Sequence, residues 1–462
     1  MRRAAWLLLV ALVLVRCGTL SVALEQPPTP DPRIDALATR VAALESQVSP
    51  LPEPTSVPPD TSWGSLAYVQ GGDIWVRALP EGEEQRLTTD GRNRAPRWSP
   101  SGAWIAFTKD DDVWLMRADA TSARRVPDSF GASWSPTADR LAYLSRTQSG
   151  AWLIEAEALG NTGSSGRGRV VFVDQPGAVA GGEIDQVLWR PDGGAIALTV
   201  QRWQPDLSTG SDEYSSSYNG IWTIVIDDEP QAAERFAADQ PTDQGLLLAD
   251  WTPDTEGLLF WYAADLDTDA AKPTLRLLTF ADGATRAVAD VAFESPAMRS
   301  IARTTVVVTS GARRSLWEAQ QLRLVDPYSD QASLLTDDQT IAFAPRCSPD
   351  GASIAYVAQP RDADFGQRRI WISTLTDPPQ VRQLTNDPAF RDEHPRWSAD
   401  ASVLMFARLT PEGRASIWMI GADGGQPWEI IDELTPAPNW NGDAGLIAWD
   451  ELLDWWVGPP GE

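Results

Sequence analysis

Hydrophobic and polar residues alternate with period two in many short segments from residue 62 to the end of the chain. In residues 95–108, a strand-like piece ends at Trp98, a Ser-Pro-Ser-Gly turn follows, and a second piece carries Ile105-Ala106-Phe107. Such alternation between turns rich in Asp, Gly and Pro is typical of β-strands joined as hairpins. The pattern therefore predicts an all-β body.

The phrase built around Trp98 returns at a fairly regular interval. Seven further copies, some of them degenerate, are centred on Trp134, Trp189, Trp251, Met298, Cys347, Trp397 and Trp440. The intervals from Trp98 to Trp440 average about 49 residues, which is within the range of propeller blades. A repeat of this period predicts blades that close into one body.

Each repeat contains four strand-like pieces in a fixed order. The Trp piece is followed by an aliphatic-Ala-aromatic triplet, an aliphatic-Trp-aliphatic triplet, and a piece that often ends in Leu-Thr. Residues 141–143, 370–372 and 384–385 are examples of these last three pieces. The set resembles the TolB-type propeller family, whose repeats carry Ser-Pro-Asp-Gly, Ile-Ala-Phe, Ile-Tyr-Val and Leu-Thr in the same order.

This resemblance covers residue 62 to about residue 457 and implies a β-propeller. It leaves the function open, because the family includes translocation-system partners, lipoproteins and the non-catalytic halves of peptidases.

The number of blades follows from the number of repeats. The first-strand phrase occurs eight times and the second-strand triplet nine times, because the N-terminal unit lacks a first strand. If Trp440 supplies that strand, the ring closes with eight four-stranded blades and no free edge remains between the first and last. Seven blades is the alternative. Residues 446–457 have no role in this scheme.

The N-terminus has the features of an export signal. Arg2 and Arg3 precede an apolar run at residues 4–15, whereas a membrane-spanning helix would place Arg16 near mid-bilayer. Cleavage after Ala23 would make residues 1–23 a signal peptide and release a secreted protein. Alternatively, Cys17 in a lipobox-like segment would carry a lipid anchor, although Arg16 stands where lipoproteins have a small residue. We expect an exported, cell-envelope protein that meets a membrane only through this anchor.

Residues 24–61 are predicted to be a spacer between the signal and the propeller of residues 62–462. Within residues 31–48, apolar residues at alternating spacings of three and four predict a short helix. That helix is either a plain spacer or a small oligomerising stalk. The Pro-rich residues 50–59 predict an extended linker.

Composition excludes several classes of function. The net charge of −26 argues against nucleic acid as a partner, because phosphate binding needs a basic surface. The two cysteines, Cys17 and Cys347, form no disulfide framework, and Cys347 is expected to be a buried free thiol. His394 is the only histidine and no G-x-S-x-G segment occurs, which argues against a His-based zinc site and against a peptidase of the prolyl-oligopeptidase kind.

One acidic segment has the spacing of a cation site. Asp265, Asp267 and Asp269 alternate along a predicted loop, and calcium loops use such spacing because alternate side chains converge on one ion. The glycine and glutamate that complete the EF-hand pattern are missing. A solvated acidic loop without any cofactor is therefore the preferred interpretation, and calcium is the alternative.

Long predicted loops gather on one face of the propeller. Loops between second and third strands of a blade emerge on the same side, and three of them are long: residues 201–220, 263–273 and 359–369. Long loops on a rigid scaffold are common binding sites, and interfaces are enriched in aromatic and Arg residues. Neutral insertions are the alternative. The candidate binding residues in or beside these loops are Trp203, Tyr214, Tyr218, Arg361, Phe365, Arg368 and Arg369.

These observations lead to two hypotheses about function. The first is an exported, non-enzymatic binding or scaffold propeller that recognises an envelope protein or peptide through its long-loop face. The alternative is a propeller-class enzyme that acts on carbohydrate or peptide through carboxylates at the central channel. An enzyme needs carboxylates or a metal converging in one pocket, whereas a scaffold needs an exposed apolar or aromatic patch.

Overall fold

The computed structural model describes residues 62–458 apart from several internal segments. The segments left out are 146–149, 157–168, 174–181, 206–213, 227–232, 237–244, 264–273, 292–297, 300–304, 311–319, 364, 377, 436–439 and 442–445. The signal, the helical spacer, the linker, Cys17 and the acidic triplet of Asp265, Asp267 and Asp269 lie outside the described residues.

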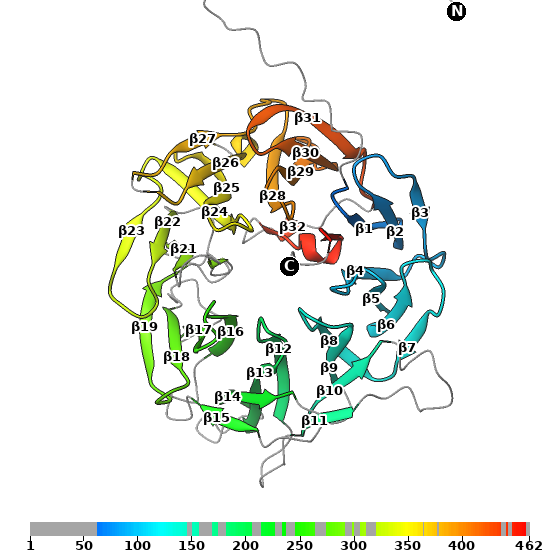
Figure 1. The fold of residues 1–462 in the computed structure, drawn as a ribbon, viewed down its shortest axis with the longest axis vertical. Coiled ribbons are helices and arrows are strands. Elements are labelled where there is room, and N and C mark those ends of the chain that lie inside the picture. Colours follow the sequence, from blue (N-terminus) through cyan, green and yellow to red (C-terminus); the bar gives the residue numbers. More distant parts are fainter. Residues whose placement is uncertain are drawn as a thin grey trace, which may run out of the picture. The chain divides into compact units, whose positions relative to one another are not determined.

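Eight four-stranded antiparallel sheets are arranged as the blades of a propeller (Figure 1). This confirms the predicted all-β class and the eight blades. The first blade contains β1 (Ser65–Gln70), β2 (Asp73–Ala78), β3 (Glu84–Arg86) and β34 (Leu453–Trp456). Blades two to four contain β4 (Asn93–Trp98), β5 (Trp104–Lys109), β6 (Asp112–Arg117) and β7 (Arg124–Val126); β8 (Ser129–Trp134), β9 (Arg140–Ser145), β10 (Gly150–Glu155) and β11 (Arg169–Val173); and β12 (Gly182–Trp189), β13 (Ala195–Pro205), β14 (Tyr214–Val225) and β15 (Glu234–Phe236).

The other four blades repeat the same order of strands. They contain β16 (Gly245–Trp251), β17 (Gly257–Ala263), β18 (Thr274–Thr279) and β19 (Thr285–Asp290); β20 (Met298–Arg299), β21 (Val306–Ser310), β22 (Gln321–Val325) and β23 (Ala332–Leu334); β24 (Thr340–Cys347), β25 (Ser353–Pro360), β26 (Arg369–Thr374) and β27 (Val381–Gln383); and β28 (Arg391–Trp397), β29 (Val403–Leu409), β30 (Ala415–Gly421) and β31 (Gly424–Ile431). Within the described residues, two short 3₁₀ helices, η2 (Phe365–Gln367) and η3 (Trp449–Glu451), accompany them.

The ring is closed by the C-terminal strand β34, which forms the inner strand of the first blade and pairs antiparallel with β1. The prediction that Trp440 supplies this strand is wrong. Trp440 begins β32 (Trp440–Asn441), which forms a separate two-stranded sheet with β33 (Leu446–Ile447). Trp455 pairs with Leu66 as Trp98 pairs with Ile105, so Trp455 occupies the repeat position. The surplus residues of the sequence-based scheme therefore contain the closing strand.

The repeat tryptophans join neighbouring blades. In four blades the indole Nε1–H donates to a backbone carbonyl on the inner strand of the preceding blade. The pairs are Trp134 with Arg97 (3.1 Å), Trp189 with Ser133 (2.9 Å), Trp251 with Leu188 (3.3 Å) and Trp397 with Arg346 (2.9 Å). Hydrophobic clusters fill the space between blades around these rings. Each tryptophan thus contributes both buried apolar area and a bond across the blade boundary.

The Ser-Pro-x-Gly phrase forms the turn between the first and second strands. In the turn at Ser348, its hydroxyl accepts the Ser353 N–H (3.0 Å), and the Gly351 N–H donates to the Ser348 carbonyl (2.9 Å). Gly351 has φ = +67°, a conformation that costs glycine little. The phrase is therefore explained by turn geometry.

The Leu-Thr phrase at the outer strand is structural too. The hydroxyls of Thr88, Thr336 and Thr385 accept N–H groups from the third strand of their own blade, at 2.8–3.0 Å. These bonds satisfy backbone donors that would otherwise be buried without a partner.

Candidate functional site

Three arginines occupy one repeat position on the inner strands that surround the channel. Arg97, Arg346 and Arg396 each come directly before the repeat Trp or Cys, and each follows a proline. The residues before these prolines have positive φ angles of 51° at Ala95, 51° at Ala344 and 57° at His394. The pairing register shifts at all three sites, which marks a β-bulge in each strand. A bulge bends its strand and redirects the side chains next to it.

Two of these arginines meet the C-terminal segment. Arg396 donates from Nη2 to the carboxylate of Asp450 (2.8 Å), and Arg97 donates to the backbone carbonyl of the same residue. Arg396 also donates from Nε to Nε2 of His394 (3.3 Å), so that ring nitrogen carries no proton. The imidazole lies 5.9 Å from the ring of Trp449. Segments from blades two and eight are thereby joined through η3.

A cavity of about 470 Å³ opens beside this cluster. Its polar lining includes the guanidinium-bearing Arg346 and Arg396 and the acidic Asp250, which come from the seventh, eighth and fifth blades. The remaining walls are mostly apolar and contain Cys347, Trp397, Met405, Leu453, Trp455 and Val457. Small-molecule sites have such volumes and such a mixture of apolar walls with a few polar groups.

Burial and the clustered arginines shift the pKa values of this region. Burial, followed by repulsion from Arg396, lowers the pKa of Arg346 to about 10. Burial also raises the pKa of the Cys347 thiol to about 12, so the thiol is neutral. It is free, as expected, but it is half-buried at the cavity wall where the sequence predicted a buried thiol. The pKa of the Asp454 carboxyl is raised by burial, although the Trp98 N–H bond and nearby arginines oppose the shift.

The only histidine of the chain is also buried in this cluster. His394 is 8% exposed. Burial lowers the pKa of His394 well below its usual value, and the charges of Arg396, Arg346 and Arg97 lower it further. The residue lies within β28, and Arg396 donates to its ring nitrogen.

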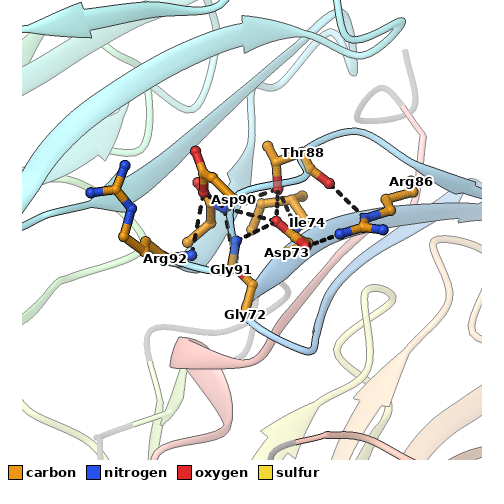
Figure 2. Close-up of polar contacts among 9 residues, drawn as sticks. Gly72, Asp73, Ile74, Arg86, Thr88, Asp90, Gly91 and Arg92 are labelled. Carbon is orange, nitrogen blue, oxygen red and sulfur yellow. Dashed lines mark hydrogen bonds and ion pairs between the residues drawn. The ribbon is translucent and has the colours of Figure 1, made fainter.

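A second polar cluster surrounds Asp73 at the junction of the first two blades (Figure 2). Its carboxylate accepts bonds from Arg86, Thr88, Gly91 and Asn93. Burial alone would raise the pKa of Asp73, but the bonds from Gly91 and Arg86 hold it below its usual value. Because protein donors surround this carboxylate, its role is to fix the connection between blades. Within the described residues no group of three or more His, Cys, Asp or Glu side chains could hold a metal.

The candidate residues of the first long loop lie on an extended hairpin. β13 and β14 pair from Ala195↔Val225 to Pro205↔Tyr214, and the pairs include Trp203↔Ser216 and Gln201↔Tyr218. Because strand positions alternate between faces, this register places positions 203, 214 and 218 on one face of the ribbon. The structure thus brings Trp203, Tyr214 and Tyr218 together in the backbone pairing.

The candidates of the third long loop have other surroundings. Arg361 donates to the Asp338 carbonyl (2.6 Å), and Phe365 lies in η2. Arg368 is 1% exposed, forms an ion pair with Glu393 (2.6 Å) and lies over the Phe343 ring (4.9 Å). Arg369 is also buried and donates to backbone carbonyls, including that of Gly366 (3.0 Å). Two of the predicted arginines therefore support the base of this loop from inside.

The arginines that line the central cavity were missed from the sequence. Their signal was present, since Ala-Pro-Arg ends at Arg346 and His-Pro-Arg ends at Arg396, each directly before a repeat position. Recognising the site would have required knowing that the bulged inner strands surround a common channel.

Comparison with known proteins supports the fold and leaves the activity open. No family model matches the chain. An uncharacterized protein of Agrobacterium fabrum strain C58 is 37% identical over 82 residues, which is 16% of this chain. The match spans 28% of that relative's own length.

Solved structures that resemble the chain include enzymes and TolB proteins. Dihydro-heme d1 dehydrogenase NirN in complex with DHE has a TM-score of 0.55 at 12% identity, covering 92% of this chain and 87% of that one. A putative dipeptidyl aminopeptidase IV from Bacteroides ovatus has a TM-score of 0.52 at 12% identity, covering 82% and 60%. TolB from Acinetobacter baumannii has a TM-score of 0.34 at 16% identity, covering 88% and 72%. At these identities the first two similarities concern the fold alone.

Proposed function

We propose that this protein is an exported, non-enzymatic binding propeller that recognises a protein or peptide partner of the bacterial cell envelope. The partner would bind the long-loop face, defined here as the face where the connections β13–β14, β17–β18 and β25–β26 emerge. These connections share one face because each joins the second and third strands of its blade.

The observation that carries this proposal is the length of the β13–β14 hairpin. β13 has 11 residues and β14 has 12, whereas the corresponding β5 and β6 of the second blade have six each. At roughly 3.4 Å per residue, five additional residues extend β13 by about 17 Å. Trp203, Tyr214 and Tyr218 all lie on this extension or beside its tip. A long ribbon that carries several large aromatic residues has the composition typical of the centres of interfaces.

The charge of the hairpin favours a particular kind of partner. Asp206, Asp212 and Glu213 occupy its tip in the sequence. Acidic residues around an aromatic centre favour a polar or cationic surface and disfavour a phosphate-rich one. Calcium bound by Asp265, Asp267 and Asp269 of the neighbouring connection remains a separate proposal. A titration with calcium that leaves the unfolding midpoint unchanged would contradict it.

The enzyme alternative has weaker support. Its carboxylates would lie at the central channel, where Asp450 is paired with Arg396 and Asp454 accepts the Trp98 N–H (2.8 Å). These two contacts hold η3 and β34 in place. A carboxylate that acts as a general acid or base must instead reach a substrate.

The test shortens the hairpin by replacing residues 201–219 with Asn-Gly, which favours a tight two-residue turn. The matched control makes the same replacement at residues 157–168, which connect β10 and β11 on the opposite face. A partner captured from envelope extract by the wild-type protein would be identified, purified and titrated against all three proteins. We expect binding to weaken by at least about tenfold in the hairpin variant alone, since central aromatic residues commonly contribute this much. Unchanged affinity in a folded hairpin variant would refute the proposal.

Attachment to the membrane requires its own test, because residues 1–61 offer two processing sites. If Cys17 carries a lipid, Cys17→Ser should move the protein from the detergent phase to the aqueous phase. A mature N-terminus at Leu24 would instead show that the protein is secreted without an anchor. Sedimentation of the mature protein with and without residues 31–48 would show whether that segment oligomerises.

A further inference from the structure

We propose that the central cavity is a binding site for a monocarboxylate with an apolar body, whose carboxylate lies between Arg346 and Arg396. This site is separate from the long-loop face. It rests on the composition of the cavity and on the contacts that orient its two arginines.

The first step concerns the orientation of Arg396. His394 accepts from its Nε and Asp450 accepts from its Nη2, at 3.3 and 2.8 Å. Within the part of the chain that the structure describes, Nη1 of Arg396 donates to no protein acceptor. The guanidinium is therefore held by two contacts while further N–H groups remain for a ligand. A planar, oriented guanidinium is well suited to a carboxylate.

The second step concerns Arg346, on the neighbouring blade. Its Nη1 donates to the Pro345 carbonyl (3.0 Å), which fixes the side chain at the bulge. Arg346 and Arg396 line the same cavity, so their like charges repel each other. An anion placed between them would interact with both guanidiniums and offset this repulsion. A protein with a net charge of −26 would otherwise have little affinity for anions.

The third step selects the class of anion. Met405, Leu453 and Trp455 provide apolar walls, so an apolar body would gain by leaving water. Asp250 also lines the cavity, and one of its carboxylate oxygens accepts the Trp251 N–H (2.8 Å). A second negative charge on the ligand would be repelled by this carboxylate. The combination favours one carboxylate over a doubly charged phosphate ester.

The test compares three probes that share one alkyl chain but differ in charge: octanoate, octanamide and octyl phosphate. Each is titrated calorimetrically into the purified full chain. We expect octanoate to bind at least about tenfold more tightly than octanamide, because hydrogen bonds to charged groups are the stronger ones. Octyl phosphate should bind more weakly than octanoate. This comparison needs only the wild-type protein, so it remains decisive if a variant fails to fold.

Two variants then locate the site. Arg346→Gln and Arg396→Gln should each remove most of the preference for octanoate over octanamide. Arg140→Gln, which removes an arginine paired with Glu155 at the surface of the third blade, should leave it unchanged. Equal binding of octanoate and octanamide, tighter binding of octyl phosphate, or an unchanged preference in both cavity variants would each overturn the proposal. Octanoate binding that does not saturate by about 10 mM would also overturn the proposal, because such binding is weaker than that of a weak specific ligand.

Discussion

The pH dependence of folding tests the environment assigned to His394, because the chain has no second histidine. The structure buries this imidazole beside three arginines, and Arg396 donates to its Nε2. Protonation would place a fourth positive charge in the cluster and remove the acceptor for Arg396. The folded state therefore holds His394 neutral at pH values where an exposed histidine is protonated.

The sign and size of the effect follow from this lowered pKa. Below about pH 6.5 the unfolded chain takes up a proton that the folded chain does not, so the free energy of unfolding falls as the pH falls. The slope approaches about 1.4 kcal/mol per pH unit, which gives up to about 2 kcal/mol between pH 6.5 and pH 5. Above pH 6.5 this contribution is fully present and constant.

The perturbation is His394→Asn, because asparagine tolerates the positive φ of 57° at this position. His394→Ala is a second variant, since alanine occupies the same bulge position at Ala95 and Ala344. Urea unfolding at pH 7.5 and pH 5.0 gives the loss of stability for each protein. Carboxylates titrate in all three proteins, so the difference between wild type and variants isolates the histidine. Equal losses in wild type and variants would refute the buried, neutral histidine.

Two further predictions concern residues beside the same channel. Trp455→Ala should lower the free energy of unfolding by about 3–5 kcal/mol, because it removes a large side chain from the closing strand. Trp455→Phe should cost about 1 kcal/mol beyond any loss of packing, because it removes the Nε1–H bond to the Trp63 carbonyl (2.7 Å). Equal stability of all three proteins in urea would contradict the role of β34. Iodoacetamide should alkylate Cys347 roughly a thousandfold more slowly at pH 8 than a free cysteine, since a pKa of about 12 leaves little thiolate. The rate should rise about tenfold per pH unit up to pH 10. Peptide mapping that shows the rate of an ordinary exposed thiol would contradict this raised pKa.

The repeat phrase made the blades predictable because each of its parts has a local physical cause. The Ser-Pro-x-Gly turn, the Leu-Thr hydroxyl and the buried Trp depend on residues within one or two blades. Closure of the ring depends instead on a pairing between residues near 66 and 455, which no local pattern encodes. Trp440 resembled the repeat more closely than Trp455 did, so the sequence favoured the wrong closing strand.

The surroundings of the candidate residues were harder to predict, for a related reason. Loop lengths and strand order were enough to place three long connections on one face. The sequence could not distinguish an arginine in a loop from one at its buried base, and Arg368 and Arg369 are buried. It also could not show that residues of blades five, seven and eight line one cavity. That arrangement exists only after the ring has closed.

The position before each repeat tryptophan explains how one fold can vary its channel. The backbone carbonyl at this position accepts the indole N–H of the next blade at Arg97, Ser133, Leu188 and Arg346. The fold thus uses the main chain of this residue and places little demand on its side chain. Arginine stands there in blades two, seven and eight, whereas Asp250 stands there in the fifth blade, opposite the closing blade. Substitutions at one repeat position can therefore change the charge of the channel while the bonds between blades remain.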